Sequence, residues 1–197
     1  MSLPVRQIRA VRHIRAVFTA STVTVYQAFP AAVAGPAART GRFPESFDRG
    51  RMTWIKPSFL WMMYRSDWGR APGQERVLAL EITRDGFEWA LARAVESSYR
   101  PRLHPSRDAW RRELRRGEVR VQWDPERDAA LRPLPWRALQ VGLRGEAVRR
   151  YADEWLVSVS DVTALAGEVR RGGGRGAPAE RPYPLPDPVA AVIGATG

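Results

Sequence analysis

The chain has 197 residues, of which 44% are hydrophobic and 10% aromatic, so it can bury one ordinary core and is expected to form a single domain. The absence of cysteine excludes a disulfide framework, a thiolate nucleophile and sulfur-ligated metal sites, and with only His13 and His104 as imidazole ligands we expect no transition metal. The formal net charge of +11 comes from 32 basic residues, and Lys56 is the single lysine among them.

The first residues hold a short direct repeat. The sequence RQIRAV at 6–11 is followed by RHIRAV at 12–17, so we expect residues 1–11 to be a duplicated basic extension outside the domain. The apolar run that follows resembles a secretory signal, but threonine, serine and glutamine interrupt it repeatedly. We therefore expect a cytoplasmic protein. No segment approaches the roughly eighteen apolar residues that span a bilayer, so no membrane partner is expected.

A hairpin and a helix are predicted next along the chain. Residues 14–18 and 23–29 are rich in β-branched and aromatic side chains around a short polar turn, which is typical of two paired strands. Pro30 favours the start of an alanine-rich helix, and Gly41 favours its end.

The segment 51–68 predicts a strand followed by a buried helix. Residues 52–55 should be extended, because the residue before a proline avoids the helical region and Lys56 precedes Pro57. A helix can begin at Pro57 or Ser58 and continue to about Ser66. Its side chains are apolar around nearly the whole circumference, so we expect it to lie in the core.

The rest of the chain mixes strands and helices without a regular βαβ period. We predict strands at 77–83, 118–123, 138–143 and 156–160, a turn at Asp85-Gly86, and helices at 87–97, 109–116 and 146–155. This order predicts an α+β domain over residues 12–171, with a mixed or antiparallel sheet and packed helices. Residues 172–197 hold six glycines and five prolines, and we expect them to form a disordered, flexible tail.

The candidate site centres on Lys56. Because every other basic residue is arginine, Lys56 suggests a need for an amine, as a nucleophile, a general base or a point charge on phosphate. The alternative is that Lys56 only lies at the edge of the core. The catalytic candidates are Lys56, Tyr64, Asp124 and Glu126. The candidates for ligand or phosphate binding are Gln27, Arg51, Trp54, Arg65, Ser66, Arg127 and Gln140.

Each other candidate has a structural alternative. Asp124 or Glu126 could orient a ribose hydroxyl or act as a general base beside Arg127, but Asp124 could equally cap a turn. The tryptophans could stack a base or form core. Gln27 and Gln140 could converge on a ligand or bond to backbone.

Basic residues concentrate in two segments. Residues 1–44 hold six arginines and no acid, and residues 100–120 hold eight arginines against three acids. Such segments can bind a polyanion such as nucleic acid or a dinucleotide phosphate, or they can simply be solvated surface.

Two family resemblances follow from these motifs. The strings VYQA at 25–28, WIKPSFLWMMYRS at 54–66, QWDPER at 122–127 and LQVGL at 139–143 resemble a bacterial and fungal family of domains of unknown function. That resemblance covers about residues 12–165 and implies one intact domain, with no activity to carry over. Its departures are the N-terminal repeat and the C-terminal glycine- and proline-rich segment.

A second, more distant likeness is to NAD-cleaving ADP-ribosyltransferase domains, through the Val-Tyr-Gln strand, the alanine-rich helix and VLALEITRDG at 77–86. It implies NAD as cofactor, an aromatic side chain stacked on nicotinamide, and a glutamate that steadies the ribose. The family's usual histidine or arginine is Gln27 here, and either Glu118 or Glu126 could be the glutamate.

The leading hypothesis is an enzyme that acts on a nucleotide or nucleic acid, with ADP-ribosyl transfer from NAD as its most concrete form. In this hypothesis the central segment and the loop at 124–127 line one pocket. The alternatives are a non-catalytic nucleic-acid-binding module, in which arginines hold phosphates and tryptophans stack bases, and a scaffold protein.

Overall fold

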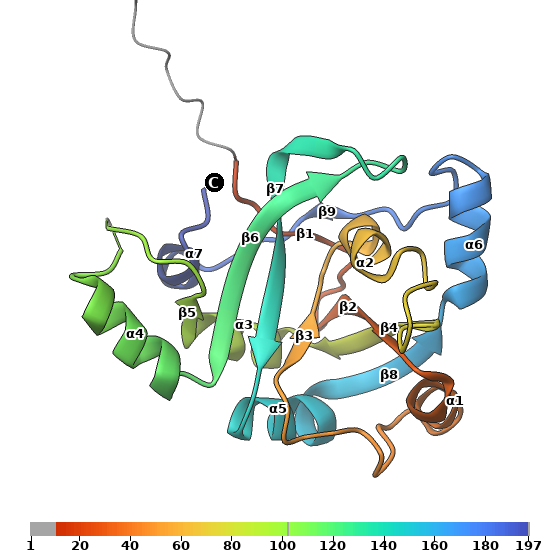
Figure 1. Cartoon of the computed structure of the whole chain (residues 1–197), viewed down its shortest axis with the longest axis horizontal. Coiled ribbons are helices and arrows are strands. Elements are labelled where there is room, and N and C mark those ends of the chain that lie inside the picture. The colour runs from red at the N-terminus through yellow and green to blue at the C-terminus, as the bar shows by residue number, and fades with distance from the viewer. Residues whose placement is uncertain (1–10, 102, 197) are drawn as a thin grey trace, which may run out of the picture.

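The computed structural model describes residues 11–101 and 103–196, and its strands form two main sheets (Figure 1). The first sheet is antiparallel, in the order β2 (Thr22–Phe29), β4 (Arg76–Thr83) and β8 (Leu156–Asp161). The second has the order β3 (Thr53–Ile55), β7 (Pro133–Leu143), β6 (Val119–Arg127) and β5 (Ala94–Glu96), and only its β5–β6 pair is parallel. The protein is therefore an α+β domain with mixed and antiparallel sheets, as predicted.

One backbone bridge links the two sheets through their edge strands. The Tyr26 nitrogen, on β2, donates to the Lys56 carbonyl at 2.8 Å, and the Lys56 nitrogen donates to the Tyr26 carbonyl at 3.2 Å. Lys56 immediately follows β3, so its backbone lies where the two sheets meet.

Helices surround these sheets (Figure 1). Their bounds are α1 (Ala31–Thr40), α2 (Phe59–Ser66), α3 (Arg84–Ala92), α4 (Arg107–Arg116), α5 (Glu146–Arg150), η1 (Tyr151–Trp155, a π-helical turn), α6 (Thr163–Arg171) and α7 (Asp187–Ile193). The main core combines inward-facing residues of the strands with α1, α3, α5, η1 and α7. A smaller cluster surrounds α2 and includes Tyr26, Phe59, Met62 and Met63.

The helix predicted after Lys56 is confirmed. The Ser58 side chain accepts a hydrogen bond from the Trp61 nitrogen at 3.2 Å and so caps α2, which ends at Ser66. Asp67 then adopts a left-handed conformation with φ of 48°, which stops the helix. Because Phe59, Met62 and Met63 are buried, α2 holds the residues that flank it in fixed positions.

Three local predictions were wrong. Asp85-Gly86 is not a turn: the Thr83 side chain accepts from the Gly86 nitrogen, and this cap starts α3 at Arg84, three residues earlier than predicted. That helix ends at Ala92, and the residues predicted to continue it form β5 instead. The N-terminal hairpin is limited to a bridge between Phe18 and Val23, because β1 (Arg15–Ala16) pairs with β9 (Arg181–Pro182).

The prediction of a disordered C-terminal tail is wrong for the part of it that the structure describes. Beyond β9, Tyr183, Val189 and Ile193 are buried in the main core. The Trp123 indole nitrogen also donates to the Ile193 carbonyl at 2.8 Å. These buried apolar residues are separated by prolines, and the high proline content of the segment led to the prediction of disorder. The predicted extension lies outside the described residues except for Val11, whose carbonyl accepts from the Arg137 nitrogen.

Within the described part of the chain, every helix is too short or too polar to traverse a lipid bilayer.

Candidate functional site

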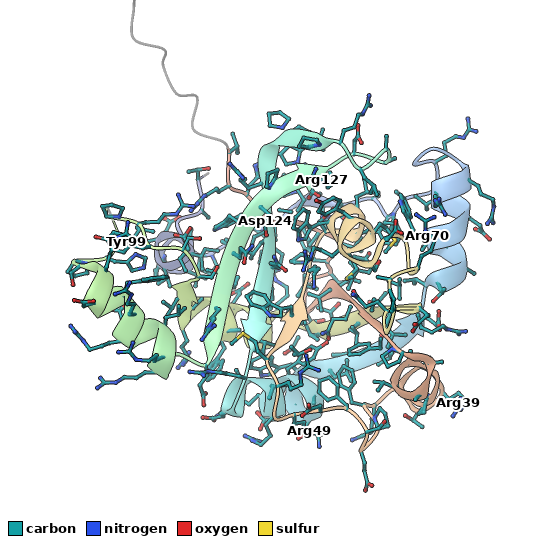
Figure 2. The ribbon with its side chains drawn as sticks, in the orientation of Figure 1. Arg39, Arg49, Arg70, Tyr99, Asp124 and Arg127 are labelled. Atoms are coloured by element: carbon teal, nitrogen blue, oxygen red, sulfur yellow. The ribbon has the colours of Figure 1, made fainter. Side chains whose placement is uncertain are left out.

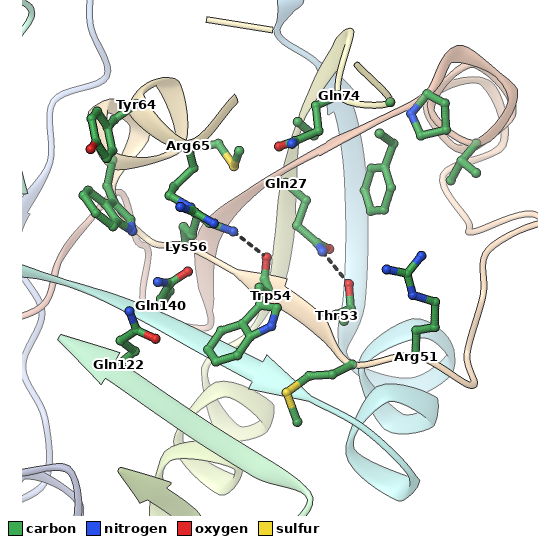
Figure 3. A pocket seen from close by; sticks show the side chains of 18 of the residues that line it. Gln27, Arg51, Thr53, Trp54, Lys56, Tyr64, Arg65, Gln74, Gln122 and Gln140 are labelled. Carbon is green, nitrogen blue, oxygen red and sulfur yellow. Dashed lines mark hydrogen bonds between the residues drawn. The ribbon is translucent and has the colours of Figure 1, made fainter. Parts of the chain in front are cut away.

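A cavity of about 960 Å³ lies beside the junction of the two sheets, between α2 and the strands β2, β3, β6 and β7 (Figure 3). Nine of the eleven predicted site residues line it: Gln27, Arg51, Trp54, Lys56, Tyr64, Arg65, Asp124, Arg127 and Gln140. The other two, Ser66 and Glu126, do not. Residues that line the cavity but were not predicted include Asp48, Thr53, Trp61, Gln74 and Gln122.

The local structure explains why these side chains meet. Trp61, Tyr64 and Arg65 have the i, i+3, i+4 spacing that places side chains on one face of α2. Gln122 and Asp124 are two residues apart on β6 and so share a face of the sheet. Gln140 of β7 lies directly across from Gln122. One helix face and one sheet face therefore build the two sides of the cavity.

Lys56 is buried at the base of this cavity, with 6% of its surface exposed. Its ammonium nitrogen donates to the Trp54 carbonyl at 3.0 Å. Burial, and secondarily the positive charge of Arg65, lowers the pKa of Lys56 to about 7, while Asp124 acts in the opposite direction. A substantial fraction of Lys56 is therefore the neutral amine near neutral pH.

Asp124 is held by two amide groups. Its Oδ1 accepts from Gln122 Nε2 at 2.9 Å, and its Oδ2 accepts from Gln140 Nε2 at 2.7 Å. Each amide donor fixes one oxygen, so the carboxylate plane is oriented without a charged partner in either bond. The alternative role of Asp124 as a turn cap is not the one its side chain adopts.

Gln27 has partners within the protein. Its Nε2 donates to Thr53 Oγ1 at 2.6 Å, as Figure 3 shows, and its Oε1 accepts from the buried Tyr151 hydroxyl at 2.6 Å. These bonds satisfy both ends of the amide, so Gln27 ties β2 to β3 and to η1 and fixes one wall of the cavity.

Aromatic rings and a guanidinium form the upper wall. Trp61 and Tyr64 stack with centroids 5.1 Å apart, and the Arg127 guanidinium carbon lies 3.9 Å from the Tyr64 centroid. Tyr64 is 38% exposed. Among the described residues, neither the buried Trp61 Nε1 nor the buried Arg127 Nε has a hydrogen-bond partner. This wall therefore combines exposed aromatic surface with unused donors.

Trp54 lies on the opposite wall, packed across β7. It pairs with Gly142, where an added Cβ would lie 3.0 Å from the indole and 2.9 Å from the Met52 sulfur, so the absence of a side chain there lets the ring pack closely. Figure 3 shows Trp54 close to Lys56 and Gln140, with Arg51 beyond Thr53. The cavity thus has aromatic surface on two sides.

Ser66 and Glu126 have other environments. Ser66 is fully buried, and its hydroxyl donates to the Met62 carbonyl at 2.9 Å, so it is a structural residue of α2. A bulge between Pro125 and Arg127 breaks the alternation of β6, so Glu126 does not share the face of Asp124. The expectation that Glu126 joins Lys56 in one pocket is therefore wrong.

Glu126 belongs instead to a buried carboxyl pair with Glu180. Burial raises the pKa of Glu126, and burial together with the charge of Glu126 raises the pKa of Glu180 to about 8. Glu180 Oε1 accepts from the Phe59 nitrogen at 2.6 Å. Glu180 therefore attaches the C-terminal segment to the start of α2.

The two basic segments of the sequence meet at Glu96. Arg12 donates to Glu96 Oε1 at 3.1 Å, and Arg100 Nε donates to the same oxygen. Arg15 donates to the Glu180 carbonyl at 2.6 Å, and the Arg107 guanidinium lies over Tyr99 at 4.7 Å. These arginines therefore serve internal contacts, and the charge available for a polyanion is smaller than the sequence suggests.

The charge of the cavity favours an anionic ligand. Four basic residues line it, Arg51, Lys56, Arg65 and Arg127, against the two acids Asp48 and Asp124. In the described parts of the chain, no three histidine or acidic side chains are grouped as a metal site would require. Guanidinium groups and an amine suit phosphate oxygens, and the carboxylate and amides suit hydroxyl groups.

Comparison with known proteins gives one family. A family model described as a domain of unknown function (DUF4291) matches residues 13–183. The match extends through β9 and ends at the buried Tyr183, so it includes part of the segment predicted to be a tail. The chain matches no curated protein.

Proposed function

The chain belongs to the DUF4291 family, and from the geometry of its cavity we propose that it is an enzyme acting on a nucleotide. The observation that carries this proposal is the presence of Lys56, as a partly neutral amine, and an oriented Asp124 carboxylate in one cavity lined by arginines and aromatic rings. Amine, carboxylate, cationic and aromatic groups in one concave site match the parts of a nucleotide.

Each part of the ligand has a suitable surface. Arg65 and Arg127 can bind phosphate oxygens through paired N–H groups. Tyr64 and Trp54 offer ring faces against which a base or nicotinamide can stack. Asp124 can accept hydrogen bonds from ribose hydroxyls, since its amide partners already hold its oxygens in position. Lys56 acts on the ribosyl unit as nucleophile or general base.

Cleavage of NAD with ADP-ribosyl transfer is the most concrete form of this activity. It is supported by the aromatic side chains, on which a nicotinamide ring can stack, and by the nearby oriented carboxylate, which can bind the hydroxyl groups of its ribose. Asp124 takes the role expected of a glutamate, because neither Glu118 nor Glu126 lines the cavity.

A thermal-shift titration tests the proposal. NAD and ATP are expected to raise the melting temperature in a concentration-dependent manner, and adenosine much less, because phosphate contacts supply most of the affinity. Arg65→Gln should weaken nucleotide binding roughly tenfold, the equivalent of one charge-assisted hydrogen bond of about 1.5 kcal/mol. Arg39→Gln is the matched control: Arg39 lies on α1, well away from Asp124 and Arg127 (Figure 2), and should bind as the wild type does.

The same titration separates the alternatives. Stabilisation by short oligonucleotides, but not by nucleotides, would favour a nucleic-acid-binding module and contradict the nucleotide site. Absence of any shift with NAD, ATP and oligonucleotides would contradict both and favour a scaffold.

A further inference from the structure

The side chain of Lys56 offers more than charge. It is the single lysine of the chain, only 6% of its surface is exposed to solvent, and it lines the cavity. We propose that Lys56 forms a covalent imine with the C1 aldehyde of a phosphorylated pentose, the sugar phosphate that remains when a nucleotide loses its base. This inference rests on the proposed function, since the sugar phosphate would occupy the same cavity.

The surroundings of the amine meet the first requirement of imine formation, an unprotonated nitrogen. Trp54 accepts one N–H of Lys56, and a carbonyl oxygen is a neutral partner that does not hold the amine in its charged form as a carboxylate would. Arg65, on the last turn of α2, adds positive charge that acts on the amine. A desolvated lysine next to another cation is the usual environment of a nucleophilic amine, and the lowered pKa of Lys56 agrees with it.

The second requirement is a group that moves protons. In the first step the nitrogen lone pair bonds to C1, the C1–oxygen π pair moves to oxygen, and that oxygen takes the proton released by the nitrogen. In the second step the hydroxyl oxygen takes the remaining nitrogen proton, the C1–oxygen bond breaks with loss of water, and the nitrogen lone pair forms the nitrogen–carbon double bond. Asp124 can accept the nitrogen proton and return it to the departing oxygen, because its carboxylate is held in the same cavity.

The third requirement is a binding site for the phosphate group. Arg65 and Arg127 line the cavity on the α2 side, and the buried donors of Trp61 and Arg127 lack partners among the described residues. Trp61 is 4% exposed, so its indole N–H has been removed from water without a compensating bond. A phosphate oxygen bound beside Trp61 and Arg127 would accept hydrogen bonds from these donors, and the C1 end of the sugar would then point toward Lys56.

Reductive trapping tests the proposal directly. The intact protein is incubated with ribose 5-phosphate and sodium cyanoborohydride, which reduces an imine to a stable secondary amine, and the adduct is located by mass spectrometry. Because Lys56 is the single lysine, a side-chain amine adduct can only be at this position. We expect a single adduct at Lys56, and at least a tenfold slower reaction with ribose, which lacks the phosphate.

Variants make the outcome specific. Lys56→Arg keeps the charge but cannot form the imine, so its trapping should be abolished. Asp124→Asn should slow trapping by at least tenfold, and a cooperative thermal unfolding transition confirms that the variant is folded.

The results separate the two proposals. Nucleotide-induced stabilisation with no adduct at Lys56 would overturn the imine and leave the nucleotide site standing. Equal trapping of ribose and ribose 5-phosphate would overturn the role given to the phosphate wall, and an adduct confined to the α-amino group would overturn the assignment to Lys56.

Discussion

Replacement of Lys56 by methionine is expected to stabilise the folded protein at pH 7. Burial lowers the pKa of Lys56 from 10.5 to about 7, so the folded state disfavours the charged amine that the unfolded chain carries. At roughly 1.4 kcal/mol per pKa unit this costs about 4 kcal/mol at pH 7. Methionine has a similar length and no charge, but it leaves the Trp54 carbonyl without its donor, at a cost of about 1 kcal/mol. We expect the free energy of unfolding to rise by about 3 kcal/mol in urea denaturation.

The pH dependence identifies the cause of this stabilisation. Between pH 7 and 10.5 the unfolded chain binds more protons at Lys56 than the folded chain does, so wild-type stability should rise with pH relative to Lys56→Met. The difference between the two proteins should therefore fall to within about 1 kcal/mol by pH 10.5. Lys56→Arg is the control: a guanidinium stays charged throughout and should destabilise the protein at every pH. A Lys56→Met protein that is less stable than wild type at pH 7 would show that the ammonium is not penalised in the fold.

Ile193→Ala is expected to destabilise the protein by about 2–5 kcal/mol, the usual range for truncation of a fully buried aliphatic side chain. Ile193 has no exposed surface and belongs to the main core, although it lies in the proline-rich segment that composition alone predicts to be disordered. Its neighbour provides the control: Val192 is 42% exposed, and Val192→Ala should change the free energy of unfolding by no more than about 0.5 kcal/mol. Chemical denaturation of both variants measures the difference. Equal, small effects would mean that α7 does not contribute to the core.

The buried charge of Lys56 should couple ligand binding to the stability of the protein. The buried amine and the two donors without partners each lower stability in the absence of a ligand. Binding of an anionic ligand would offset these costs, so ligand binding and stability should be linked more strongly here than at a neutral surface.

The central segment is predictable from sequence because several local rules agree there. Pro57 forces the residue before it to be extended, Ser58 caps the helix, and the apolar side chains of α2 require burial. Strand alternation then places Asp124 on one face of the sheet with Gln122, although Gln122 itself was not among the predicted residues.

The errors arise where a single local feature changes the geometry. One bulged residue in β6 moves Glu126 to another environment, and alternation cannot anticipate it. The C-terminal segment folds because a few apolar residues reach the core between prolines, and its glycine and proline content hides them. The short β5 forms by pairing with β6, which is distant in sequence, so local preference alone places the end of α3 too late.

The state of the Lys56 amine can be measured directly, because a chain with one lysine gives one side-chain signal when lysine is labelled with ¹⁵N. We predict that this signal titrates with a midpoint near pH 7, and that a saturating nucleotide moves the midpoint upward because a phosphate beside the amine favours its charged form. A midpoint close to 10.5 that no nucleotide changes would contradict both the burial of the amine and its role in the cavity.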